Sequence, residues 1–261
     1  MKEMTERIIS IVKQAGATVR EKGYSRIDDK GSKDNHVTDM DLAVEAFLKK
    51  ELLDLVPGSS FIGEEEDFLD NHGEYCWIVD PIDGTTNFIR HIPACAVSVA
   101  LMKGESGEIG VVYNPFTDEL FHAEKGCGAF LNGIRIHVSD KDLAHSMFGT
   151  SWGAYDKSIS GPVFDIARDM YFKCEDIRRI GSAAYEMCKI AQGGIDVYFE
   201  PILYPWDYAA ASIVLSEAGG FFSDVTKDLD YRSRTMVCAA NSEENLVYIR
   251  ELARKAYGLR E

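Results

Sequence analysis

Apolar residues recur every three or four positions in two early segments, and this is the spacing of one helix face. The segments are residues 4–19 and 44–55, and each predicts a helix. Thr38 introduces the second helix as a capping residue, and Pro57 stops it. Residues 28–36 are polar, so we predict a loop between the two helices.

The period then changes to short runs rich in Val, Ile and aromatic residues, separated by Gly, Asn and Pro turns. These runs predict adjacent antiparallel strands at residues 75–80, 96–102, 110–113, 119–124 and 129–138. In the last third, helical patterns cover residues 161–171, 182–192, 206–218 and a segment from Ser242. Strands are predicted between them at residues 174–180, 195–200, 221–224 and 236–240. The chain should therefore form an α+β fold, a layered sandwich of helices and sheets.

The length of 261 residues suits a single domain, residues 1–261, with approximate lobes 1–140 and 141–261. The first seven residues are polar, and no apolar run approaches the ~20 residues that span a membrane. We expect a cytoplasmic protein without a membrane partner. The six cysteines are scattered without a C-x-x-C pair, which indicates reduced core residues.

The net charge of −15 disfavours binding to nucleic acid, because nucleic acids are held by clustered Lys and Arg. No nucleic-acid partner is therefore expected. Such a surface also repels a phosphate ester, so an anionic substrate would need a bound cation.

Acidic residues stand where apolar or strand-like segments meet turns: Glu64, Glu65, Asp80, Asp83 and Asp207. Each alone could cap a turn or a helix. Together, without an organised set of His or Cys, they form an oxygen-only environment that suits Mg²⁺ or Mn²⁺ better than zinc.

The densest acidic segment is D-P-I-D-G-T-T-N-F at residues 80–88. Pro81 stiffens the turn, and the two carboxylates stand three residues apart, so both can face one site. Gly84 allows the backbone to approach a ligand closely. A helix that begins at Gly84 would add a seat for phosphate. Metal and phosphate would then share one pocket.

The segment W-I-V-D-P-I-D-G-T-T-N-F at residues 77–88 closely resembles the inositol monophosphatase family, as do G-E-E at 63–65 and W-D-Y-A-A-A-S-I-V-L-S-E-A-G-G at 206–220. Two residues separate the aspartates, which argues against the D-x-D-G-T pattern of haloacid dehalogenases. The resemblance spans essentially the whole chain. It implies an αβαβα sandwich of the sugar phosphatase type, usually a homodimer, that uses two or three Mg²⁺ ions, for which Mn²⁺ can substitute.

The same resemblance implies the metal ligands Glu64, Asp80, the Ile82 carbonyl, Asp83 and Asp207. Asp80 would bridge two metals, and Glu64 with waters would hold a third, weaker one. The implied catalytic residues are Glu64, Thr85 and Asp41; Thr85 and Asp41 would orient the attacking water. For Asp41 the sequence leaves a second interpretation open, because Thr38-x-x-Asp41 is also a capping box.

By the same resemblance, the substrate contacts are Asp83, Gly84, Thr85, Gly181, Ser182, Ala183, Glu200 and Asp207. Two further candidates are Ser151 and Lys30, which could equally be an ordinary solvated lysine. Trp77 and Trp206 are expected in the core. The histidines, His36, His91 and His122 among them, form no set and are expected in the core or on the surface.

We therefore expect hydrolysis of inositol monophosphates to inositol and phosphate by metal-activated water, with the lithium sensitivity common in this family. Fructose-1,6-bisphosphatase activity, alone or as a second activity, is the alternative within the same chemistry. A non-catalytic, RNA-associated regulator with the same fold is the alternative of another class. It would need a local basic patch formed by Arg168, Arg178, Arg179 and Lys189.

Overall fold

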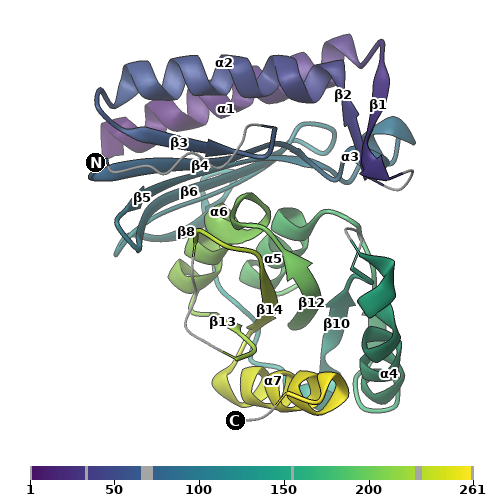
Figure 1. Cartoon of the computed structure of the whole chain (residues 1–261). Helices are drawn as coiled ribbons and strands as arrows, with labels where there is room; N and C mark the ends of the chain where they lie inside the picture. Colours follow the sequence, from purple (N-terminus) through teal and green to yellow (C-terminus); the bar gives the residue numbers. More distant parts are fainter. Residues whose placement is uncertain (1, 33–34, 66–72, 154–155, 227–230, 260–261) are drawn as a thin grey trace.

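The computed structural model shows alternating layers of helices and sheets, stacked from top to bottom in Figure 1. It describes residues 2–32, 35–65, 73–153, 156–226 and 231–259, except the side chains of residues 2, 29–32 and 35. Two long helices lie on a seven-stranded sheet, two helices lie beneath it, and a five-stranded sheet with two more helices follows. The predicted αβαβα sandwich is confirmed.

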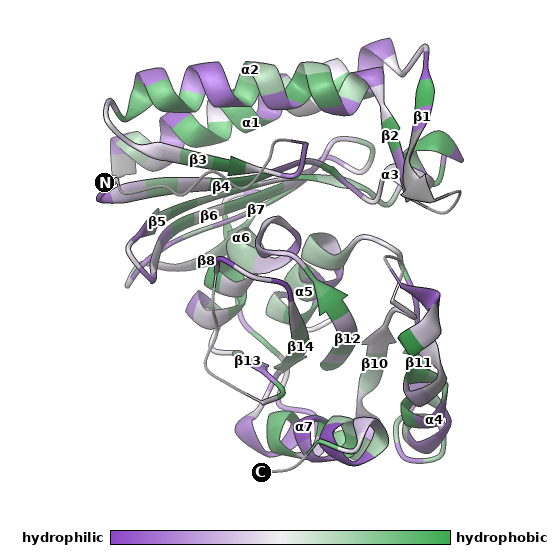
Figure 2. Ribbon diagram, in the orientation of Figure 1, coloured by the Kyte–Doolittle hydropathy of each residue, from purple (hydrophilic) through white to green (hydrophobic). Residues whose placement is uncertain are grey.

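The first layer consists of α1 (Lys2–Lys22) and α2 (Asp39–Leu55), close to the two predicted helices. Their apolar faces pack on the large sheet, with Ile8 and Leu48 fully buried. Figure 2 shows hydrophobic and hydrophilic residues alternating around both helices. The polar loop predicted at residues 28–36 is wrong: β1 (Ile27–Ser32) and β2 (Asn35–Thr38) pair there as an antiparallel hairpin. Backbone pairing, which hydrophobic patterns do not report, forms it.

The large sheet runs in sequence order, with β3 parallel to β4 and all other neighbours antiparallel. Its strands are β3 (Ser60–Gly63), β4 (Tyr75–Asp83), β5 (Ala96–Lys103), β6 (Ser106–Asn114), β7 (Glu119–Glu124), β8 (Gly128–Leu131) and β9 (Ile134–Ile136). The sequence missed β3 and merged β8 with β9. Asn132 and Gly133, at φ 48° and 78°, form the two-residue turn that separates them.

The small sheet has the order β11-β10-β12-β14-β13. Its strands are β10 (Met147–Thr150), β11 (Asp176–Arg178), β12 (Val197–Leu203), β13 (Phe221–Asp224) and β14 (Thr235–Ala240). Helices α4 (Ser160–Tyr171) and α7 (Glu243–Tyr257) cover its outer face. The sequence pattern did not predict β10, a four-residue strand. None of the described helices has the length and apolar composition needed to cross a membrane.

Two helices between the sheets, α5 (Ala183–Ala191) and α6 (Pro205–Glu217), form the central layer (Figure 1). α6 is buried from Pro205 to Leu215 and is rich in alanine, which allows close packing. A Cβ at Gly110 on β6 would lie 2.4 Å from the Ala210 carbonyl oxygen, so the backbones of sheet and helix touch here. This contact holds α6 close against the large sheet.

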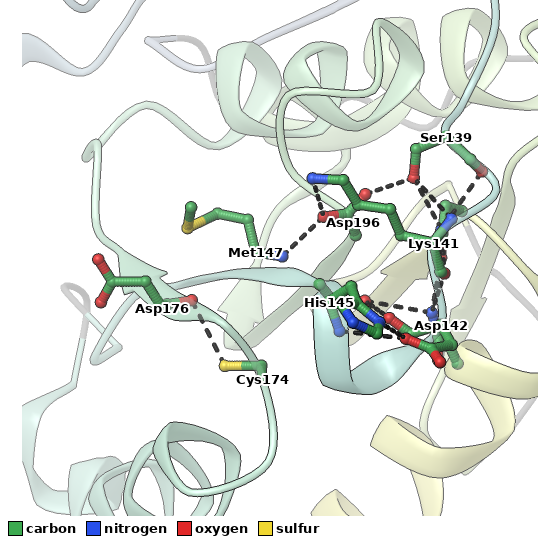
Figure 3. Close-up of polar contacts among 11 residues, drawn as sticks. Ser139, Lys141, Asp142, His145, Met147, Cys174, Asp176 and Asp196 are labelled. Carbon is green, nitrogen blue, oxygen red and sulfur yellow. Dashed lines mark hydrogen bonds and ion pairs between the residues drawn. The ribbon is translucent and has the colours of Figure 1, made fainter.

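The chain crosses from the large sheet to the small one through residues 137–146, and Asp196 anchors this crossing (Figure 3). Asp196 is fully buried. Its carboxylate accepts hydrogen bonds from the Ser139 hydroxyl and, at 2.6 Å, from the Met147 amide. Asn241 donates to Ser139 Oγ at 3.0 Å. These bonds link the crossing segment to the start of β10.

Candidate functional site

A cavity of about 570 Å³ lies where several element ends meet. These ends belong to β4, β10, β12, α5, α6 and the short helix α3 (Thr85–Ile89). All the predicted metal ligands line it: Glu64, Asp80, Ile82, Asp83 and Asp207. The tertiary structure therefore brings together acidic residues that are as many as 143 positions apart, from residue 64 to residue 207.

A bulge in β4 explains how Asp80 and Asp83 reach one site. Side chains alternate between the two faces of a strand, so residues three apart normally point to opposite faces. Opposite β5, Asp80 pairs with Ser98 but Asp83 pairs with Ala96, so β4 contains one extra residue. Pro81, which has no N–H to pair, lies in this irregular stretch, and the Ile82 amide donates to Asp80 Oδ1 at 2.9 Å.

Asp80, Asp83 and Asp207 form a tight, buried carboxylate cluster. One oxygen of each lies within 4.8 Å of the others, and the side chains are between 1% and 5% exposed. Burial raises the pKa of all three carboxyls, that of Asp83 to about 6, and the nearby charge of Glu64 raises those of Asp80 and Asp207 further. The repulsion among these neighbouring carboxylates favours the binding of a divalent cation, and an all-oxygen donor set fits Mg²⁺.

Helix α3 begins directly after this cluster, as the sequence suggested. Gly84 is its N-cap at φ 93°, and a Cβ there would lie 3.0 Å from the Gly181 carbonyl oxygen. Both the backbone angle and the close approach therefore require glycine. The Thr85 hydroxyl lies 3.1 Å from the Ile82 carbonyl oxygen and 3.2 Å from Asp41 Oδ1.

Asp41 forms the capping box of α2 and also contacts Thr85. Its Oδ2 accepts from the Thr38 amide at 2.8 Å, which completes the capping box of α2. Its Oδ1 lies at hydrogen-bond distance from Thr85 Oγ. The side chain is fully buried, so Asp41 reaches the cavity through Thr85. One carboxylate can make both contacts because its two oxygens face different partners.

Asp83 also joins the two halves of the site. Its oxygens accept from the Ser182 hydroxyl at 2.6 Å and from the amides of Ala183 and Ala184 at 3.1 and 2.8 Å. These donors belong to the N-terminus of α5. Ser182 and Ala183 were expected to contact the substrate. Both line the cavity, but the Ser182 hydroxyl and the Ala183 amide donate to Asp83. The contact holds β4 and α5 together.

Asp207 and Glu200 complete the opposite wall. Asp207 stands in the first turn of α6, and the Tyr204 amide donates to its Oδ2 at 2.7 Å. Glu200, on β12, accepts a hydrogen bond from the Tyr198 hydroxyl, and burial raises its pKa to about 7. Ser151 lies beside Glu200 at the end of β10 and also lines the cavity. The side chain of Lys30 lies outside the described part of the chain.

The loop that carries Glu64 rests on Glu45, a residue that the sequence did not single out. Glu45 stands one helical turn after Asp41 on α2 and is 3% exposed. Its Oε2 accepts from the Glu65 amide at 3.0 Å. A Cβ at Gly63 would lie 2.3 Å from the same oxygen, so glycine makes room for Glu45. The four-residue spacing of Asp41 and Glu45, which places both on one helix face, was the sequence signal that could have identified Glu45.

Several residues that were not predicted at this site also line the cavity: His36, Asn87, Trp152, Lys157, Phe164, Arg179 and Glu186. The expectation that the histidines lie in the core or on the surface is wrong for His36. Asn87 donates to the carbonyl oxygens of Ala94 and Ile180 at 2.7 and 2.8 Å, which ties α3 to the segment before α5. Trp77 is fully buried, as expected.

Comparison of the sequence and the fold with those of known proteins identifies the family of this chain. The model of the inositol monophosphatase family matches residues 1–256. An inositol monophosphatase of Dictyostelium discoideum is 38% identical over 241 residues, 88% of each protein. The Nus factor SuhB of Vibrio cholerae is 38% identical over 214 residues, 81% of this chain and 80% of that protein. The crystal structure of extragenic suppressor protein suhB from Bartonella henselae has a TM-score of 0.87 and 32% identity, covering 96% of this chain and 98% of that one. The chain therefore belongs to the inositol monophosphatase family.

Proposed function

We propose that this protein is a Mg²⁺-dependent phosphatase that hydrolyses inositol monophosphates to inositol and phosphate. The observation that carries the proposal is the buried cluster of Asp80, Asp83 and Asp207 beside the hydrogen-bonded pair Thr85 and Asp41. Glu64 and the Ile82 carbonyl would complete the metal ligands. Bound Mg²⁺ would lower the pKa of a coordinated water from about 16 toward 7 and neutralise charge on the phosphate.

The Thr85 and Asp41 pair would orient the attacking water. The Thr85 hydroxyl has one proton, which it can direct to Asp41 Oδ1 or to the Ile82 carbonyl oxygen. When the proton points to Asp41, the lone pairs of Thr85 Oγ are available to accept a proton of the water. Asp41 is buried and also accepts a hydrogen bond from the Thr38 amide, so its position relative to Thr85 is fixed.

The substrate would lie between α3 and β12. The Gly84 and Thr85 amides stand at the start of α3, where they can hold the phosphate. Glu200 lies at the wall formed by β12 and can accept hydrogen bonds from ring hydroxyls. Fructose 1,6-bisphosphate would use the same chemistry and remains the alternative substrate.

The test is phosphate release from inositol 1-phosphate and fructose 1,6-bisphosphate, each with magnesium and with excess chelator. We expect metal-dependent release that is fastest with inositol 1-phosphate. Asp207→Asn should reduce kcat by at least about 100-fold, because it removes one charge from the cluster at nearly constant volume. Asp165→Asn is the matched control, because Asp165 is exposed on α4. Wild-type release that survives the chelator would contradict the proposal.

A regulatory role is the second candidate, because several relatives are named Nus factor SuhB. The basic patch considered from the sequence does not favour it. Arg168 pairs with Asp165 at 3.0 Å, Arg178 with Asp176, and Lys189 with Glu119. An RNA pull-down at moderate salt, with wild type and Asp207→Asn, separates the candidates. RNA retained by both proteins would favour the regulator.

A further inference from the structure

Two side chains hold the turn of Ile180 and Gly181, which connects β11 to α5. The Asn87 amide donates to the Ile180 carbonyl oxygen at 2.8 Å and lies 3.3 Å from that of Gly181. Glu186 Oε2 accepts from the Gly181 amide at 3.1 Å. Because Ile180 and Gly181 belong to no helix or strand, these side chains supply the partners that a helix or strand would otherwise provide.

Stability does not account for the presence of Glu186. The side chain is fully buried, and its Oε1 has no hydrogen-bond partner among the described residues. A buried carboxyl group with one satisfied oxygen costs free energy, because burial disfavours its charge and leaves a polar atom unpaired. An apolar side chain of similar size would avoid that cost. Such a residue in the wall of a ligand cavity is typical of a role in the site itself.

The turn contacts both parts of the site. Directly after it, the Ser182 hydroxyl and the first amides of α5 donate to Asp83 at distances between 2.6 and 3.1 Å. On the other side, the Gly181 carbonyl oxygen would lie 3.0 Å from a Cβ at Gly84, the N-cap of α3. A shift of the turn would therefore move the donors on Asp83 and disturb the backbone at the proposed phosphate seat.

We propose that Glu186 and Asn87 are positioning residues: by holding this turn, they orient Asp83 toward the metal and keep the phosphate seat at Gly84 in place. The inference rests on the proposed phosphatase function and adds two residues to its site. Neither residue acts on the reacting atoms. Metal and phosphate are common to all substrates, so the effect of the two residues does not depend on which alcohol carries the phosphate.

The test measures the magnesium concentration for half-maximal activity, and KM for inositol 1-phosphate and fructose 1,6-bisphosphate at saturating magnesium. Glu186→Leu removes the acceptor for the Gly181 amide, and Asn87→Ala removes the donor to Ile180. Each should raise the magnesium requirement and both KM values by roughly 3- to 30-fold, as for other residues that support metal ligands. The kcat at saturation should stay within about fivefold of wild type.

A conservative variant separates positioning from simple packing. Glu186→Gln keeps an oxygen that can accept from the Gly181 amide, so it should bring all three constants back to within about threefold of wild type. Glu251→Leu is the control, because the Glu251 side chain is 62% exposed on α7 and does not line the cavity. The double variant of Glu186→Leu and Asn87→Ala should be less impaired than the product of the two single effects, because both act through one turn.

Metal binding without turnover gives a second readout. Isothermal titration calorimetry of Mg²⁺ into the metal-free protein should show a Kd that rises by a similar factor in Glu186→Leu but not in Glu186→Gln. Melting curves in chelator identify a variant that fails to fold, and the comparison then rests on Asn87→Ala, which perturbs the same turn from α3.

Equal behaviour of the Leu and Gln variants would overturn the positioning role, as would an unchanged magnesium requirement in Asn87→Ala. Single effects that multiply in the double variant, or a KM that changes for one substrate only, would also overturn it. Wild-type inactivity on both substrates, with Mg²⁺ binding that weakens in Glu186→Leu and not in Glu186→Gln, rejects the phosphatase function and retains the positioning role.

Discussion

At the residue scale, Thr85 has a role that no other side chain of the site duplicates. Its hydroxyl is the only described group placed at hydrogen-bond distance from both the Ile82 carbonyl oxygen and Asp41 Oδ1. The hydroxyl stands at the start of α3 because Gly84 adopts a left-handed conformation before it. In the proposed mechanism, the group that accepts a proton of the attacking water is therefore this one oxygen atom.

Thr85→Val removes that oxygen with little change in shape, so it tests the orientation of the water directly. We expect kcat for inositol 1-phosphate to fall by about 100-fold or more, in the range of a lost acid–base contact. Thr85→Ser keeps the hydroxyl and should retain activity within about tenfold. The two variants should unfold at temperatures close to that of the wild type. Similar activity of the Val and Ser variants would exclude the role proposed for the hydroxyl.

Glu186 supports a prediction about pH. It is fully buried in α5 beside the cavity, accepts from the Gly181 amide at 3.1 Å, and its Oε1 has no partner among the described residues. Burial raises its pKa to about 8 from 4.5. Between these two pKa values, the carboxyl releases its proton in the unfolded chain but keeps it in the folded protein. The free energy of unfolding therefore falls as the pH rises through this window. The full contribution of Glu186 to stability is present only below about pH 4.5.

Glu186→Gln should remove this part of the pH dependence, because the amide stays neutral throughout. In chelator, the variant should melt above the wild type at pH 8, with each kcal/mol raising the melting temperature by about 2–4 °C. The difference should shrink or vanish at pH 5. A variant whose melting temperature follows the wild type in parallel from pH 5 to 8 would show that Glu186 does not titrate as expected.

At the element scale, α2 supports two segments that carry proposed metal ligands. Asp41 in its first turn contacts Thr85, and Glu45 one turn later binds the backbone beside Glu64. A capping box fixes the start of the helix, and its buried face, including Leu48, fixes its rotation. Residues one turn apart face the same side, so both carboxylates face the segments that form the site.

Glu45→Gln should therefore weaken metal binding more than catalysis. Replacing one acceptor oxygen with an amide group disturbs the loop that positions Glu64, while Thr85 and Asp41 stay in place. We expect the magnesium concentration for half-maximal activity to rise by about 3- to 30-fold, with kcat at saturating magnesium within about fivefold of wild type. Glu51→Gln, on the exposed side of α2, is the control. Equal magnesium dependence of the two variants would reject the positioning role.

At the scale of the whole molecule, the site lies where both sheets and the central helices meet. Asp80 and Asp83 come from the large sheet, Glu200 from the small one and Asp207 from α6. Bringing these carboxylates together costs free energy because burial and mutual repulsion both disfavour their charges. A bound cation would offset that cost and would so couple metal binding to stability.

Magnesium should consequently raise the melting temperature of the wild type above its value in chelator. A metal concentration 100 times Kd contributes about 2.7 kcal/mol, which corresponds to several degrees for a chain of this length. Asp207→Asn should melt higher than the wild type in chelator, because one repelling charge is gone, and should gain less from magnesium. Equal gains for wild type and variant would place the metal elsewhere. Differential scanning calorimetry at one protein concentration measures all four values.

The sequence predicted most of the helices and long strands because their apolar residues repeat at the helix or strand period. It missed β3, β10 and the hairpin of β1 and β2, which are short and rely on backbone pairing with neighbours. Of the acidic residues that line the cavity, the sequence identified Glu64, Asp80, Asp83, Glu200 and Asp207, since carboxylates where apolar segments meet turns stand out, and it missed Glu186. Trp152, Phe164 and Glu45 were not identified either, because each looks like an ordinary helix or loop residue until its neighbours are known.

The sequence by itself determined the local chemistry: the residue types of D-P-I-D-G-T-T, the glycine after Asp83, and the periods of the helices and strands. These depend on interactions between residues close along the chain. Only the tertiary structure decided that a bulge turns Asp80 and Asp83 to one side, that Asp41 both caps α2 and contacts Thr85, and that an aromatic pair faces the same cavity. Those features depend on distances between elements far apart in sequence, which packing of the layers sets and no local pattern encodes.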